Sequence, residues 1–380
     1  MPQFDFVSHV DIHRTPRVMQ LEGMFDVAPT QRSENRWSVA LPLDEKPWQI
    51  GLIVGPSGSG KSTLAREAFG DSLVGGFDWP ADKSIVDAFP AGLGIKDITA
   101  LLSSVGFSSP PAWLRPFRCL SNGEQFRVTL ARALADERSV VAVDEFTSVV
   151  DRTVAQIGSA AVAKAVRRQP DRRFVAVTCH YDVEAWLCPD WTVEMPNGGF
   201  AWRSLRRPSI DLEITRVHRD AWKLFRHHHY LDTGLNSASN CYVARIDGRP
   251  AAFAAVGHFP HAVRPGYREH RVVCLPDFQG VGIGNAVSEY MGSLYLATGK
   301  PYRSITGNPA MIRHRCRSPL WRMTRRPSLA ANTNMKTSRL ANIRALSRTL
   351  ADNRYTASFE YVGPVRREQA RQFGLPVSSR

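Results

Sequence analysis

A phosphate-binding loop is the clearest chemical pattern in this chain. Residues 55–63 read Gly-Pro-Ser-Gly-Ser-Gly-Lys-Ser-Thr, between an apolar run at 50–54 and a helical pattern at 64–69. Glycines there let backbone N–H groups surround phosphate oxygens, and a helix N-terminus adds partial positive charge. Lys61 is expected to reach the β- and γ-phosphates, and Ser62 to bind Mg²⁺. A glycine-rich turn without a ligand is the alternative. The predicted phosphate site consists of Gly55, Ser57, Gly58, Ser59, Gly60, Lys61, Ser62 and Thr63.

A second loop suggests which class of P-loop protein this is. Residues 120–127 read Leu-Ser-Asn-Gly-Glu-Gln-Phe-Arg and resemble the signature loop Leu-Ser-Gly-Gly-Gln of ABC-type ATPases. Asn122 replaces the first glycine of that pair, and Glu124 replaces its glutamine. Ser121 and Gly123, which the resemblance places against a γ-phosphate, are kept. In that family the loop completes the site of a second copy, so the resemblance implies a homodimer or a partner ATPase.

Two apolar runs typical of buried strands complete the resemblance. The run at 139–143 ends in Asp144-Glu145, similar to a Walker B strand, and the run at 174–178 precedes Cys179-His180. The resemblance implies that Asp144 acts on Mg²⁺ through water, that Glu145 polarises the attacking water, and that His180 contacts the γ-phosphate. Residues 148–151, Ser-Val-Val-Asp, resemble the D-loop of the same family.

One element of the ABC family is missing. Its members carry a Gln between P-loop and signature loop, and residues 71–110 contain none. Asp78, Trp79 and Asp82 occupy the corresponding region, and the sequence does not distinguish among them. That Gln couples nucleotide state to a partner domain, so we expect no transporter partner of the ordinary kind.

Composition and charge predict a globular protein that binds phosphate-rich partners. The chain has 380 residues, 43% hydrophobic and 22% charged, and its net charge is +14. We expect no membrane span, no signal peptide, and a cytoplasmic location with reduced cysteines. Residues 290–351 contain no Asp or Glu, and Tyr302, His314 and Trp321 interleave with their basic side chains. Nucleic acid is the expected partner, and a solvated basic face is the alternative. The basic residues of this stretch are Lys300, Arg303, Arg313, Arg315, Arg317, Arg322, Arg325, Arg326, Lys336, Arg339, Arg344 and Arg348.

Two domains are predicted, an α/β ABC-type ATPase domain at 1–205 and an α+β domain at 213–380 with a mostly antiparallel sheet. Residues 204–212 indicate the linker between them. A small helical subdomain fits between the P-loop and the signature loop, and residues 17–21 are interpreted as one strand of a pair.

The second domain begins with a helical pattern at 220–225. Apolar runs at 240–246 and 251–259 flank an Asp-Gly turn, a strong hairpin signal, and a third strand is predicted at 271–275. A glycine loop and a helix from residue 285 follow. This order resembles the acyl-CoA-binding core of GNAT N-acyltransferases. Gln279, Gly282 and Gly284 match the family loop Gln/Arg-x-x-Gly-x-Gly/Ala. The resemblance implies that backbone N–H groups from Gly280 onward bind the pyrophosphate of an acyl-CoA such as acetyl-CoA.

Catalytic groups in this domain are harder to choose. Glu269 and His270 border the central strand and are the first candidates for a base, although surface roles fit them equally well. His227, His228 and His229 could bind a metal, but neighbouring histidines rarely converge on one ion. Residues 303–311 and 318–322 resemble the Mom-like GNAT branch of phage DNA-modifying proteins, which is sometimes joined to ABC-type ATPases.

These resemblances predict an ATPase coupled to acyl transfer onto nucleic acid, with DNA bases as the expected acceptor. The sequence leaves RNA, protein and small molecules open as acceptors, along with the acyl group and the role of ATP hydrolysis. The alternatives are an ATP-regulated protein or small-molecule acyltransferase, and an ABC ATPase of a transport or DNA-clamp system whose second domain does not catalyse.

Overall fold

The computed structural model describes residues 3–29, 32–229, 234–261, 263–329 and 355–378, grouped in two compact units. Unit 1 comprises Met1–Asp78, Asp136–Val150 and Val162–Arg207, and unit 2 comprises Trp79–Ala135, Asp151–Ala161 and Pro208–Arg380. Unit 1 therefore ends within the predicted linker, whereas the segment with the signature loop belongs to unit 2. No helix of the described ranges has the length and apolar character that crossing a membrane requires.

A six-stranded sheet forms the centre of unit 1. Its strand order is β4-β5-β6-β3-β7-β8; all neighbours are parallel except β7 and β8. The central strand β3 is buried along its whole length, as a strand covered on both faces must be. The strands are β3 Ile50–Val54, β4 Leu73–Val74, β5 Val140–Val143, β6 Arg173–Thr178, β7 Trp191–Glu194 and β8 Gly199–Trp202. Helices α2 Lys61–Phe69 and α7 Glu184–Leu187 lie in the same unit.

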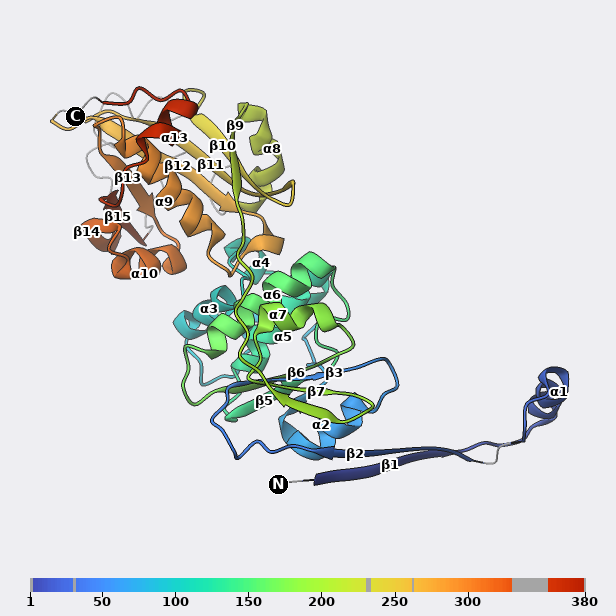
Figure 1. The fold of residues 1–380 in the computed structure, drawn as a ribbon. Coiled ribbons are helices and arrows are strands. Elements are labelled where there is room, and N and C mark those ends of the chain that lie inside the picture. The colour runs from blue at the N-terminus through green and yellow to red at the C-terminus, as the bar shows by residue number, and fades with distance from the viewer. Residues whose placement is uncertain (1–2, 30–31, 230–233, 262, 330–354, 379–380) are drawn as a thin grey trace. The chain divides into compact units, whose positions relative to one another are not determined.

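The N-terminal residues form a separate hairpin, with helix α1 at its tip (Figure 1). Strands β1 (Gln3–Asp11) and β2 (Arg32–Ala40) pair antiparallel, and α1 spans Pro16–Phe25. The predicted strand at 17–21 is therefore wrong. Thr15 caps α1 and proline occupies its first turn, so the local signals for a helix start outweigh the apolar alternation.

Unit 2 contains the predicted helical segment. Its helices here are α3 Ile95–Ser104, α4 Pro110–Trp113 and α5 Asn122–Leu134, and α6 (Arg152–Val166) begins in this unit. Helix α5 starts with a capping box, in which the Ser121 hydroxyl accepts from the Glu124 N–H and the Glu124 carboxylate accepts from the Ser121 N–H.

A seven-stranded sheet, in the order β14-β15-β13-β12-β11-β10-β9, forms the rest of unit 2. All neighbours are antiparallel except β12 and β13, which share only two register pairs. The strands are β9 Glu213–Val217, β10 Asn240–Ile246, β11 Arg249–Phe259, β12 Gly266–Cys274, β13 Tyr302–Thr306, β14 Trp321–Leu329 and β15 Tyr355–Tyr361. The predicted hairpin is confirmed, and the third strand starts earlier than expected.

Helices cover both faces of this sheet. Helix α9 (Ile283–Leu296) packs on one face, above Tyr242 and Ala244 of β10. The short helix α8 (Trp222–Phe225) packs on the other face, with Cys241 and Val243. Alternate residues of one strand thus enter two cores, as the two-residue period of a strand requires. Among the described residues of this unit, two more helices are α10 Pro309–Arg317 and α13 Arg367–Gln372, the latter packed against α9.

Candidate nucleotide site and the glycine loop of unit 2

Three neighbouring strands of unit 1 bring the predicted phosphate-binding residues to one edge of the sheet. The P-loop follows β3, Asp144 follows β5, and His180 lies two residues beyond β6. Because these strands are adjacent and parallel, their carboxyl ends lie together. Ligands of open parallel sheets bind at such edges.

Backbone geometry explains the glycines of the loop. Gly58 and Gly60 have φ angles of 76° and 88°, in a region of backbone conformation that residues other than glycine rarely adopt. A Cβ on Gly60 would lie 2.8 Å from the ring of Trp37, which stacks on Phe6. Sequence reasoning missed Trp37, because an aromatic residue in a β-hairpin carries no signal of its own.

The side chains that would hold a metal ion face each other. The Ser62 hydroxyl donates to Asp144 Oδ1 at 3.1 Å, and Lys61 Nζ donates to the Pro56 carbonyl oxygen at 2.6 Å. The hydroxyl of Ser59 is buried and has no hydrogen-bond partner within the described residues. A hydroxyl beside a carboxylate is a donor set that suits Mg²⁺, and the loop offers a buried polar group without a protein partner. These residues fit a Mg²⁺–phosphate group.

The remaining predicted groups lie on short turns after the strands. Glu145 has a φ of 52°, and its carboxylate accepts a hydrogen bond from the Ser148 hydroxyl at 2.5 Å. The backbone N–H of His180 donates to Thr178 Oγ1 at 3.2 Å. Gly55 is buried at the end of β3, Ser57 is exposed, and Thr63 lies in the first turn of α2.

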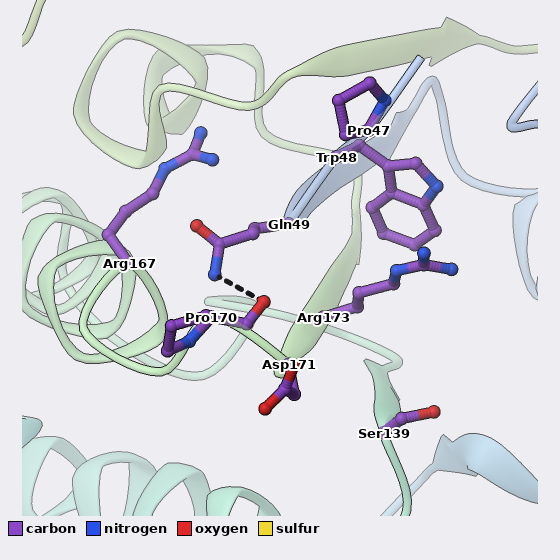
Figure 2. A pocket seen from close by; sticks show the side chains of 8 residues that line it. All are labelled: Pro47, Trp48, Gln49, Ser139, Arg167, Pro170, Asp171 and Arg173. Carbon is purple, nitrogen blue, oxygen red and sulfur yellow. Dashed lines mark hydrogen bonds between the residues drawn. The ribbon is translucent and has the colours of Figure 1, made fainter. Parts of the chain in front are cut away.

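A separate pocket of about 520 Å³ lies at the opposite edge of the same sheet (Figure 2). Gln49 and Ser139, which line it, directly precede β3 and β5. Gln49 Nε2 donates to the Gln169 carbonyl oxygen at 2.8 Å, and Arg167 pairs with Asp190. The pocket therefore contains none of the predicted phosphate-binding residues.

In unit 2, the signature residues begin α5. The exposed Ser121 donates its hydroxyl to Glu124 Oε2 at 3.1 Å as part of the helix cap. A Cβ on Gly123 would lie 3.4 Å from Val154. Trp79, one of three residues considered in place of the missing Gln, stacks on Phe117 with ring centroids 4.6 Å apart.

The predicted CoA loop of unit 2 packs against the segment that contains the signature loop. The Gln279 side chain accepts from the Ser108 N–H at 2.9 Å and donates to the Cys274 carbonyl oxygen at 2.8 Å. A Cβ on Gly280 would lie 2.8 Å from Gly106. Gly282 is the N-cap of α9 with a φ of 107°. A Cβ on Gly284 would make only an ordinary van der Waals contact, 4.0 Å from Cys274 Cβ.

Arg127 of α5 holds this loop from the other side. Its guanidinium donates to the carbonyl oxygens of Asp277 and Gln279 at 3.0 and 3.1 Å. It also donates to the Val105 and Gly106 carbonyl oxygens at 3.3 and 3.4 Å. Only 1% of Arg127 is exposed, and this burial lowers the pKa of its guanidinium to about 10.

Glu269, a predicted base, lies in a buried polar network. Its carboxylate pairs with Arg315 at 3.0 Å and accepts from the Ser304 hydroxyl at 2.8 Å. The Ser288 hydroxyl is a further donor to the same carboxylate. His270 differs, since its Nε2 accepts from the Asn236 N–H at 3.1 Å.

The structure changes part of the sequence-based account of the basic stretch. Tyr302 and Trp321 are 0% and 6% exposed, so they cannot form the predicted stacking surface. Arg315 is 1% exposed and cannot meet a phosphate, because Glu269 binds it in the core. Residues 336, 339, 344 and 348 lie outside the described residues. Within the described residues, no group of three or more His, Cys, Asp or Glu could hold a metal ion, and the described histidines 227–229 form none.

Comparisons with known proteins concern a part of the chain. No family model matches it. The methionine import ATP-binding protein MetN of Cutibacterium acnes (strain DSM 16379 / KPA171202) is 34% identical over 146 residues, covering 28% of this chain and 40% of the relative. The chain thus spans less than half the length of this curated relative.

Two solved structures are similar at low identity. A bacterial Atm1-family ABC exporter with ATP bound is 18% identical, with a TM-score of 0.34, over 45% of this chain and 35% of that chain. The dimeric structure of a bacterial ABC transporter cassette is 17% identical, with a TM-score of 0.35, over 46% and 94%. The 34% identity to part of MetN, the P-loop and the signature-like loop together support an ABC-type ATPase domain in this chain.

Proposed function

We propose that this chain binds ATP with Mg²⁺ at the P-loop and hydrolyses it, within a domain that spans residues 1–205. The observation that carries the proposal is the Ser62–Asp144 contact of 3.1 Å beside the glycine loop. It joins a P-loop hydroxyl to a carboxylate at the end of β5, which β6 separates from the P-loop strand β3, and phosphoryl transfer uses such a pair. The similarity to an ATP-binding protein supports the choice of nucleotide.

Each residue then has a definite task. Lys61 and the backbone N–H groups of the loop bind the phosphates, and Ser62 and Asp144 hold the metal ion. When bound by these residues, Mg²⁺ would supply positive charge against the phosphate oxygens. Glu145 orients the attacking water, and His180 contacts the γ-phosphate. Trp37, against Gly60, offers a ring on which a base can stack.

We infer a homodimer, and the position of the signature residues at the start of α5 supports it. Ser121 is exposed there, so its side chain is accessible to the nucleotide of a second copy. Mg²⁺-ATP should convert Glu145→Gln from monomer to dimer, because slow hydrolysis keeps both nucleotides in place. Size-exclusion chromatography with light scattering measures this, and a monomer at saturating ATP would exclude the dimer.

Calorimetry of ATP binding tests the ATP site. Lys61→Ala should remove measurable binding, because the β- and γ-phosphates lose their cation. The exposed Lys83→Ala provides the control for loss of one positive charge and should bind as the wild type does. Equal affinity of Lys61→Ala and wild type would contradict the proposal.

As a second candidate function we propose acyl-CoA-dependent transfer by a GNAT-like domain at 213–380, with nucleic acid, most directly DNA, as acceptor. The strand arrangement supports it. Strands β12 and β13 are parallel and pair only at Tyr267–Tyr302 and Arg268–Arg303, so they separate beyond these pairs. The glycine loop and α9 connect the two strands. An extended acyl-CoA arm fits between separating strands, with its pyrophosphate at the α9 N-terminus.

Within this proposal His270 takes precedence over Glu269 as the base. The Glu269 carboxylate is engaged by Arg315, Ser304 and Ser288, which leaves it little capacity to accept a substrate proton. His270 Nε2 accepts a hydrogen bond from the Asn236 N–H, and a ring nitrogen that accepts hydrogen bonds is the kind of group that a base needs.

A charge-matched pair of variants tests the CoA site. Gly284→Asp places a negative charge in the first turn of α9 where pyrophosphate would lie, and Gly284→Asn adds the same volume without charge. Acetyl-CoA affinity should fall far more in Gly284→Asp than in Gly284→Asn. If the wild type does not bind acetyl-CoA, the transport or DNA-clamp alternative, with a second domain that does not catalyse, takes precedence.

A further inference from the structure

A row of charged residues crosses the unit 2 sheet from strand to strand. Arg268 pairs in register with Arg303, Arg303 with Glu360, and Glu360 with Arg322. These residues lie on β12, β13, β15 and β14, which are neighbours in that order. Residues in register on adjacent strands point to the same face of a sheet. The four side chains therefore form one transverse row.

The neighbouring residues show which face this is. Each residue of the row has a large aromatic chain neighbour on its own strand. These neighbours are Tyr267, Tyr302, Tyr361 and Trp321. All four are buried in the core that contains α9. Since successive side chains alternate, the arginines point to the opposite face.

Positive charge exceeds negative charge in this row. Glu360 pairs with Arg322 at 2.7 Å, with Arg264 at 3.4 Å and with Arg303 at 3.6 Å. The side chains of Glu360 and Arg303 are 8% and 15% exposed, whereas those of Arg264 and Arg322 are 56% and 58% exposed and are the accessible ends of the cluster. A single carboxylate thus holds several guanidinium groups together and neutralises only one of them.

At the β12 end of the row, the ring of Phe259 packs against two of the guanidinium groups. The guanidinium carbons of Arg303 and Arg268 lie 5.3 and 5.5 Å from its ring centroid. Arg303 also donates to the Arg264 carbonyl oxygen at 2.9 Å. Stacked, hydrogen-bonded guanidinium groups lose little further side-chain entropy when they bind an anion.

We propose that the three arginines of this row, Arg268, Arg303 and Arg322, together with Arg264 just before β12, bind the sugar–phosphate backbone of a nucleic acid; these four are called the arginine row. The inference rests on the proposed nucleic-acid partner and names the surface that contacts it. Strands lie about 4.8 Å apart, so Arg268 and Arg322 are roughly three strand spacings apart. One phosphate, with hydrogen bonds about 2.9 Å long, cannot reach both ends. A chain of phosphates can, and guanidinium groups match phosphate oxygens in pairs.

The next row on the same face continues the surface. Ile305 pairs with Ser358, and Ser358 with Arg325. Ile305 is 45% exposed, and Arg325 donates to Thr356 at 2.6 Å. An exposed apolar side chain beside cations offers contact to sugars and bases, which a purely solvating surface would not need.

Fluorescence anisotropy of the full chain with a labelled DNA duplex, and with single-stranded DNA and RNA of the same sequence, tests the surface. Arg264→Gln/Arg322→Gln should weaken binding and flatten the log–log salt dependence by about 0.7 to 0.9 per lost phosphate contact. Arg219→Gln/Arg371→Gln removes the same charge from exposed positions outside the row and should keep the wild-type slope. Thermal unfolding monitors the folded state of every variant.

Removing the carboxylate should have the opposite effect. Glu360→Gln should tighten binding and steepen the salt dependence, because Arg264 and Arg322 lose their internal partner; a structural role alone would not strengthen binding. If Arg264→Gln/Arg322→Gln and Glu360→Gln both keep the wild-type salt dependence, the arginine row is not the contact surface, while the nucleic-acid partner stands. A wild type that binds anionic phospholipid vesicles but no nucleic acid would overturn both. Neither result bears on ATP hydrolysis, which is measured separately without nucleic acid.

Discussion

Arg127 donates a hydrogen bond of 3.1 Å to the carbonyl oxygen of Gln279. The first residue lies in the helix that the signature loop begins, and the second opens the glycine loop before α9. The Gln279 side chain in turn accepts from the Ser108 N–H, so both partners belong to one part-buried junction within unit 2. A displacement of α5 would therefore displace the glycine loop as well.

Arg127→Ala should destabilise unit 2 by about 3 kcal/mol or more, because several buried carbonyl oxygens lose a charged donor at once. Hydrogen exchange should rise at residues 275–285 before other parts of the sheet. Urea unfolding and exchange mass spectrometry measure the two effects. The exposed Arg118→Ala is the matched control and should change stability by less than about 0.5 kcal/mol. Unchanged exchange at 275–285 in Arg127→Ala would argue against the junction.

The Glu269–Arg315 pair should behave as a structural pair. Glu269→Gln or Arg315→Met alone should each cost about 3–5 kcal/mol, because the remaining charge stays buried without a partner. The double variant should recover much of that loss. A double-mutant cycle from denaturant unfolding measures the coupling. If Glu269→Gln is as stable as the wild type, Glu269 regains its standing as a candidate base.

The cysteines should differ sharply in reactivity. Burial raises the pKa of the Cys274 thiol to about 12, whereas Cys119 and Cys316 are exposed. Since the thiolate is the reactive form, iodoacetamide at about pH 8 should label Cys119 and Cys316 in the folded protein and spare Cys274. Peptide mass spectrometry follows each site, and labelling in denaturant provides the positive control. Early labelling of Cys274 would contradict the expected protection of its thiol by burial.

The P-loop edge was predictable because its signals are local. A glycine run, a lysine and an apolar strand lie within a few residues, and the order of strand ends then brings Asp144 to Ser62. The hairpin at Asp247-Gly248 was predictable for the same reason. The strand predicted at 17–21 was wrong because Thr15 and Pro16 are stronger signals than short apolar alternation.

Long-range partners were not predictable. Arg315 and Trp321 were assigned to a nucleic-acid surface because they lie in an acid-free stretch, yet the buried partner of Arg315 is Glu269, 46 residues earlier. The arginine row likewise depends on strand register across β12, β13, β15 and β14, which no local pattern encodes.

Asp144→Asn should weaken ATP binding in the presence of Mg²⁺ and leave binding in EDTA almost unchanged. The amide keeps the hydrogen bond to Ser62 but lacks the charge that a divalent cation requires. Calorimetry with and without Mg²⁺ compares the two conditions. An equal loss under both would assign Asp144 a role in the fold and not in metal binding.

Steady-state phosphate release from ATP by the full chain, measured for wild type and Glu145→Gln, tests the central proposal most directly. The account predicts Mg²⁺-dependent turnover in the wild type, and in Glu145→Gln intact ATP binding with turnover reduced by at least about a hundredfold, the scale of general-base catalysis. Wild-type turnover in Glu145→Gln, or no ATP binding by the wild-type protein, would contradict it.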